Sequence, residues 1–183
     1  MKTALTLLAV VTVLAAPPLS ALQTGTEPES PVVRAGIPES DGELSTEVQL
    51  YVGRGNELSG QLRFNAAARE YQRAADVARH EGHLASATSW LLASAHYYDG
   101  NLPEAAAALD QLATEAALVG DLAVEALAIY NAAWLNGKAG RGVEMEARVT
   151  RLEGLLRSQY MPVAIRERLG SWLRISKEVA SAP

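Results

Sequence analysis

The sequence predicts an all-α fold in which helices pack as successive helix-turn-helix pairs. Three observations support this prediction. Alanine, leucine and arginine dominate after residue 43, and these residues lose little side-chain entropy in a helix. Apolar residues recur at spacings of three and four from Leu44 onward, which is the period of an amphipathic helix. Breaks containing glycine interrupt this pattern at regular intervals and divide the chain into about seven helices.

These breaks predict where each helix begins and ends. Pro103 and Pro162 stand at helix starts, where the N–H that proline lacks would have no partner within the helix. We expect helices over residues 44–59, 64–80, 84–98, 103–119, 122–137, 143–159 and 162–180.

The first 21 residues have the layout of a secretory signal peptide. Lys2 supplies a positive start, residues 4–16 are apolar except for two threonines, and small residues precede a cleavage position after Ala21. The apolar stretch is too short to span a bilayer, and no later segment is apolar enough to do so. We therefore expect a periplasmic or secreted protein, with an uncleaved anchor as the alternative.

The mature chain is expected to consist of a linker and one helical domain. Residues 22–42 hold three prolines, three glycines and several acidic residues, with almost nothing to bury, which predicts a flexible linker. Residues 43–183 are long enough for one domain with a core. The chain has no cysteine, so no disulfide stabilises it and its stability depends on packing.

Small residues repeat at a spacing that indicates helix pairs. In the first helix of each pair they are Gly55, Ala93 and Ala133, which are 38 and 40 residues apart. The second-helix markers keep the same two spacings and are Ala67, Ala105 and Met145. We expect small residues at these positions because the two helices of a pair cross closely there.

On these residues the sequence resembles the tetratricopeptide repeat (TPR) family, over roughly residues 48–158. The first pair matches best, with Tyr51, Gly55, Leu58, Phe64, Ala67, Tyr71 and Ala74. The spacing exceeds the family's period of about 34 residues, and Arg54 and His96 stand where the family has leucine and an aromatic residue. The resemblance implies an α-solenoid of about three TPR-like helix-turn-helix pairs.

The last predicted helix is expected to cap this stack. Its apolar face holds Leu169, Trp172, Leu173 and Val179. Its polar face holds Arg166, Arg168, Arg174 and Lys177. A terminal helix with one apolar and one charged face covers the exposed end of a repeat array.

The resemblance also implies a binding face, because the first helix of each TPR pair lines a concave surface that receives peptides. When the family's pattern is applied to this sequence, five residues lie on that surface: Trp90, Ser94, Tyr97, Tyr130 and Trp134. Such aromatic residues suit an interface, since they bury a large area and keep a polar atom. The alternative is that these rings fill the core, and a shift of one residue in helical phase would replace Tyr97 by Tyr98.

Catalytic and metal-binding patterns are sparse. The sequence has no glycine-flanked nucleophilic serine, no phosphate-binding glycine loop and no cysteine, so we expect neither an enzyme nor a cofactor. The alternative is a small metal-binding protein or enzyme that uses His80, His83 and His96. These histidines can also be explained by a structural role, since histidine near a helix C-terminus interacts favourably with the helix dipole.

Charge is divided unevenly along the chain. Residues 80–137 contain seven acidic residues and no lysine or arginine, whereas residues 138–183 contain nine basic and five acidic residues. Three interpretations of these acidic residues are open. They keep the domain soluble, they bind a partner with a basic patch, or they allow end-to-end self-association of oppositely charged regions. The net charge of −5 disfavours nucleic acid as a partner.

Taken together, the sequence predicts an exported helical-repeat scaffold that mediates protein–protein interaction in the cell envelope, with a protein or peptide partner.

Overall fold

The computed structural model describes residues 44–180, with side chains described as far as Arg174. Within this range every regular element is a helix, so the all-α prediction is confirmed. The helices are α1 (Thr46–Gly60), α2 (Phe64–His80), α3 (Ser86–Tyr98), α4 (Leu102–Val119), α5 (Leu122–Lys138), α6 (Gly142–Leu156) and α7 (Val163–Ala180). The predicted signal peptide and the linker over residues 22–42 lie outside the described residues.

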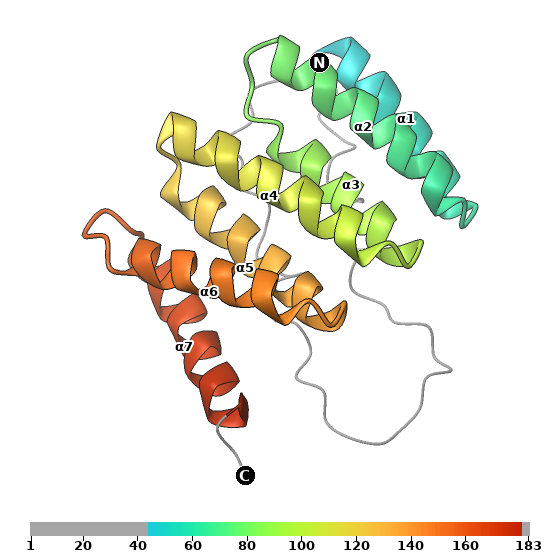
Figure 1. Ribbon diagram of the computed structural model, residues 1–183. Helices are drawn as coiled ribbons and strands as arrows, with labels where there is room; N and C mark the ends of the chain where they lie inside the picture. The colour runs from blue at the N-terminus through green and yellow to red at the C-terminus, as the bar shows by residue number, and fades with distance from the viewer. Residues whose placement is uncertain (1–43, 181–183) are drawn as a thin grey trace.

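The helices are arranged in two layers (Figure 1). Each helix from α1 to α6 runs antiparallel to the next and packs against it. Helices α2, α4 and α6 form one layer, and α1, α3 and α5 lie behind them. Helix α7 packs against α5 and α6 at the end of the array. The turns that connect one pair to the next therefore lie along one edge, and the turns within pairs lie along the opposite edge.

Helix ends are set by short-range backbone contacts. The Asp121 carboxylate accepts hydrogen bonds from the backbone N–H groups of Ala123 and Val124 and caps α5. Gly120 ends α4 with φ of 77°, a left-handed conformation that costs glycine little. Helix α6 ends at Leu156, three residues before the predicted end, because the chain tightens there into a turn in which Ser158 N–H donates to the Leu155 carbonyl.

Alanine makes up much of the core. Between α2, α3 and α4 the buried residues are mostly alanine, with Tyr71, Leu92 and Leu109 as the larger side chains. Toward α7 the core contains larger groups, among them Leu112, Ile129, Tyr130, Leu152 and Leu169. Small side chains let helices approach closely. The core is therefore thinner between α2, α3 and α4, where alanine dominates, than toward α7.

One of the predicted close crossings, at Gly55, is present, and in the third pair the close approach lies at Gly137, one turn after the predicted Ala133. A β-carbon added at Gly55 would lie 2.4 Å from Cε1 of Tyr71. Burial raises the pKa of Tyr71 to about 12, and its hydroxyl donates a hydrogen bond to Asn56 Oδ1 at 2.8 Å. In the third pair Met145 replaces the usual alanine, and Gly137 faces it, with a β-carbon position 2.9 Å from the sulfur. A larger residue on one helix is thus matched by glycine on the other.

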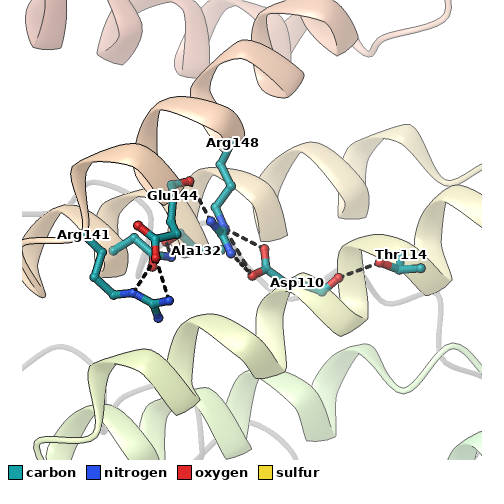
Figure 2. Close-up of polar contacts among 7 residues, drawn as sticks. Asp110, Thr114, Ala132, Arg141, Glu144 and Arg148 are labelled. Atoms are coloured by element: carbon teal, nitrogen blue, oxygen red, sulfur yellow. Dashed lines mark hydrogen bonds and ion pairs between the residues drawn. The ribbon is translucent and has the colours of Figure 1, made fainter.

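Ion pairs connect successive helices of the α2, α4 and α6 layer. Arg79 on α2 donates from Nε to Glu115 on α4 at 2.6 Å. Figure 2 shows the next connection, in which the Arg148 guanidinium of α6 reaches the Asp110 carboxylate of α4, with 2.8 Å from Nε to Oδ1. The Arg148 Nη1 also donates to the Glu144 carbonyl at 2.6 Å. These pairs join residues 36 and 38 positions apart, so they connect one helix pair to the next.

The apolar and polar faces of α7 lie as expected, with one exception. Leu169 and Leu173 are buried and Arg168 and Arg174 are exposed. Arg166, expected on the polar face, is instead partly buried and donates from Nη2 to the carbonyls of Ser158 and Met161. It therefore fixes the turn between α6 and α7. The side chains of Lys177 and Val179 lie outside the described residues.

The Gly55 crossing generates a stability prediction. Gly55→Ala should lower the free energy of unfolding by about 1–3 kcal/mol, because the buried and hydrogen-bonded Tyr71 ring has no room to move aside. The matched control is Gly53→Ala in the same helix, where a β-carbon meets nothing within 4 Å. That change should raise stability by about 0.5–1 kcal/mol through helix propensity. Urea unfolding followed by circular dichroism measures both, and equal effects would contradict the close crossing.

The Arg148–Asp110 pair generates a second prediction. A double-mutant cycle with Arg148→Ala and Asp110→Ala should return a coupling of about 0.5–1 kcal/mol, because both groups are partly shielded from water. The same cycle on Arg157 and Glu153, which are 3.9 Å apart with the arginine 80% exposed, should return about 0 kcal/mol. A coupling at Arg148 no larger than at Arg157 would mean that the inter-pair bridge adds nothing to stability.

Candidate functional site

Aromatic rings from α3 and α5 meet at the edge that holds the turns within pairs. The Tyr97 and Trp134 ring centroids are 5.8 Å apart with the planes tilted by 36°. Tyr98 contacts Tyr97 edge-on at 5.4 Å and stacks on Phe64 of α2 at 5.3 Å. All four rings are partly exposed. We call Tyr97, Trp134 and Lys138 with these neighbouring rings the aromatic face.

A cation completes the aromatic face. The Lys138 ammonium lies 4.7 Å from the Trp134 ring centroid and 5.8 Å from that of Tyr97. Lys138 follows Trp134 by four residues, so one helical turn places both side chains on the same side of α5. Among the described residues Lys138 has no carboxylate in ion-pair contact, and its charge is held by the faces of the two rings.

Two more of the predicted residues continue this surface along α3. Trp90 and Ser94 precede Tyr97 by seven and three residues, so the three side chains follow one side of the helix. Both are partly buried. Trp90 packs against two buried clusters, the alanine-rich one between α2, α3 and α4 and the one toward α7. The structure thus brings Tyr97 and Trp134 into direct contact and leaves Trp90 and Ser94 farther along the same helix.

Tyr130 is the exception and lies in the core. Its exposed fraction is 0%, although Trp134, four residues later, remains partly exposed. The ring of Trp172 from α7 contacts Tyr130 edge-on at 4.3 Å and covers it. The alternative interpretation as core filler therefore describes Tyr130. Helical spacing alone places Tyr130 beside Trp134, and only the packing of α7 on α5 separates their surroundings.

The three histidines do not come together. His80 ends α2 and His83 lies in the following turn, whereas His96 lies ten residues into α3, about 15 Å along the helix axis. Burial lowers the pKa of His96, opposed by the nearby carboxylates of Glu104 and Asp99. No group of three or more His, Cys, Asp or Glu side chains within residues 44–174 is arranged to hold a metal ion.

Several acids of the middle segment are already engaged by the fold. Glu115, Asp110 and Glu125 form ion pairs with arginines of other helices. Asp121 caps α5 through its side chain. Of the seven acidic residues in this segment, four therefore serve packing or capping, and fewer remain to attract a basic partner.

The aromatic face is suited to binding a partner surface. Ring faces accept apolar groups and cations, the tyrosine hydroxyl and indole N–H form hydrogen bonds, and an ammonium attracts anionic groups. Burial, together with the neighbouring Tyr97, raises the pKa of Tyr98, so its hydroxyl stays protonated and neutral at physiological pH. A partner surface that combines an apolar group with a carboxylate would meet both kinds of contact here.

No family model, curated protein or solved structure matches this chain. None of the helices between residues 44 and 180 combines the length and apolar character needed to cross a bilayer.

Sequence patterns did not assign Lys138 or Phe64 to the aromatic face, nor Trp172 to the covering of Tyr130. Lys138 was detectable, because its spacing from Trp134 puts it one helical turn away on the same side of α5. Phe64 and Trp172 approach the site from α2 and α7, and no local spacing indicates which distant helix packs on which ring.

Proposed function

We propose that this chain is an exported α-solenoid scaffold, built from three TPR-like helix pairs and a capping helix, that binds a protein or peptide partner in the cell envelope. The observation that carries the proposal is the contact of Tyr97, Trp134 and Lys138 on the first helices of adjacent pairs. These are the helices that bind peptides in the family that the sequence resembles.

The composition of the aromatic face supports a protein partner. Tyrosine and tryptophan bury a large area with few rotatable bonds, so ordering them on binding costs little conformational entropy. Tyr97 and Trp134 hold each other in place, which lowers that cost further. Lys138 lies over both rings, and a carboxylate of the partner would find its ammonium already positioned. The partner segment that fits is therefore one with an apolar side chain beside an acidic residue.

The arrangement of the helices supports the scaffold assignment. The two layers, the close approaches within the first and third pairs and the ion pairs from one pair to the next support a repeated arrangement. Repetition of this kind produces an extended surface from equivalent helices. Such a surface suits recognition of a linear segment.

The aromatic face generates a binding prediction. Trp134→Ala should weaken capture of the partner from envelope extract about thirtyfold or more, with the melting temperature nearly unchanged, because the ring is partly exposed. Tyr160→Ala is the matched control, since that ring is 77% exposed on the opposite edge. Tyr130→Ala should instead lower the free energy of unfolding by about 3–5 kcal/mol. Unchanged capture by Trp134→Ala would remove the aromatic face from the proposal.

Export is tested separately. The mature protein should begin near Leu22 and be recovered from the periplasm or medium, because the signal peptide is removed during secretion. N-terminal sequencing after cell fractionation measures both. Recovery of an intact N-terminus beginning at Met1 on protein in the cytoplasm would contradict the envelope assignment.

A further inference from the structure

A shallow, open hollow lies on the opposite edge of the molecule from the aromatic face. Its volume is about 550 Å³. The two turns that connect one helix pair to the next and the turn before α7 all contribute to its lining, which consists of Leu84, Val119, Gly120, Asp121, Leu122, Ala123, Tyr160 and Pro162. These turns follow one another along the left edge in Figure 1. Asp121 is the one charged residue of this lining, and its carboxylate already caps α5.

Large apolar side chains surround this hollow. Val119 is 68% exposed and Tyr160 is 77% exposed, although both line it. Leu118 and Val163, next in sequence to lining residues, are also exposed. Four exposed apolar side chains at or next to one hollow favour a surface that something covers.

The chain enters the described fold beside this hollow. Leu44 packs against a buried cluster that includes Ala85, and the residue before Ala85, Leu84, lines the hollow. The entry point is fixed, because Gln49 donates from Nε2 to the Leu44 carbonyl at 2.7 Å and Ser45 caps α1. The described part of the chain therefore begins at the edge where the apolar side chains are exposed.

We propose that residues 31–38 of this same chain, with the sequence Pro-Val-Val-Arg-Ala-Gly-Ile-Pro, occupy the hollow and cover it. Val33 precedes Leu44 by eleven residues, a span of up to about 40 Å when extended. Two or three helix spacings of 8–10 Å separate the start of α1 from the turn between α4 and α5, or about 20–30 Å. The segment is therefore long enough to reach.

The chemistry of the segment fits the hollow. Val32, Val33 and Ile37 are the branched apolar residues of the predicted linker, and Pro38 disfavours a helical conformation at Ile37. An extended backbone suits a shallow site formed by turns. Residues 31–38 carry one charge, Arg34, and the lining of the hollow carries one of opposite sign, Asp121.

Disulfide trapping in the full-length exported chain tests this docking. The natural chain has no cysteine, so two introduced thiols are the only ones present. Val33→Cys and Ile37→Cys are each combined with Val119→Cys at the hollow. The matched controls combine them with Val143→Cys, which is 81% exposed at the start of α6 on the opposite edge. Oxidised glutathione drives disulfide formation, which non-reducing gels and mass spectrometry follow.

At least one pair with Val119→Cys should close about tenfold faster than its Val143→Cys control, at a rate independent of protein concentration, because docking raises the local thiol concentration. Adding Tyr160→Asp should abolish the difference, while circular dichroism confirms an unchanged fold. Equal rates at the two edges would overturn the proposal. So would disulfides that form only between chains in proportion to concentration, which would assign the hollow to a second copy.

Discussion

At Gly55 the backbone of α1 lies so near the ring of Tyr71 that there is no space for even one methyl group. The same constraint appears in the third pair, where Gly137 faces Met145. Close approach of this kind fixes how far apart the two layers lie. It also explains why alanine fills so much of the core between α2, α3 and α4, since larger side chains would push those helices apart.

A thin alanine core buries little apolar area per residue, so other contacts contribute more to holding the pairs together. Arginines supply several of them. Arg79 and Arg148 reach from one second helix to the next, and Arg151 of α6 donates to the buried carboxylate of Glu125 on α5 at 2.7 Å. Three of the seven acids that make the middle of the sequence look strongly negative are thus partners of arginines from other helices.

The same geometry determines which aromatic side chains remain accessible. Side chains from α3 and α5 meet at one edge, where Tyr97 lies against Trp134 with Lys138 over both rings. Toward the end of the array α7 covers the equivalent surface, and Trp172 closes over Tyr130. The aromatic face and the hollow then lie on opposite edges, one formed by turns within pairs and the other by turns between pairs. Two partners, or a partner and a segment of the chain itself, would not compete for the same surface.

Local patterns in the sequence determined the helices, because periodicity, proline at helix starts and glycine in the turns act within a few residues. The spacing of Gly55, Ala93 and Ala133 also indicated the pairing, since helices that cross closely need small residues at a fixed period. Only the tertiary structure decided the surroundings of individual side chains. Tyr130 and Trp134 share one side of α5, yet one is buried and the other partly exposed, because α7 packs over only part of that side. Arg166 likewise lies on a face that periodicity marks as polar, but the turn before α7 offers it two carbonyl groups. Contacts between distant helices depend on packing that no short stretch of sequence encodes.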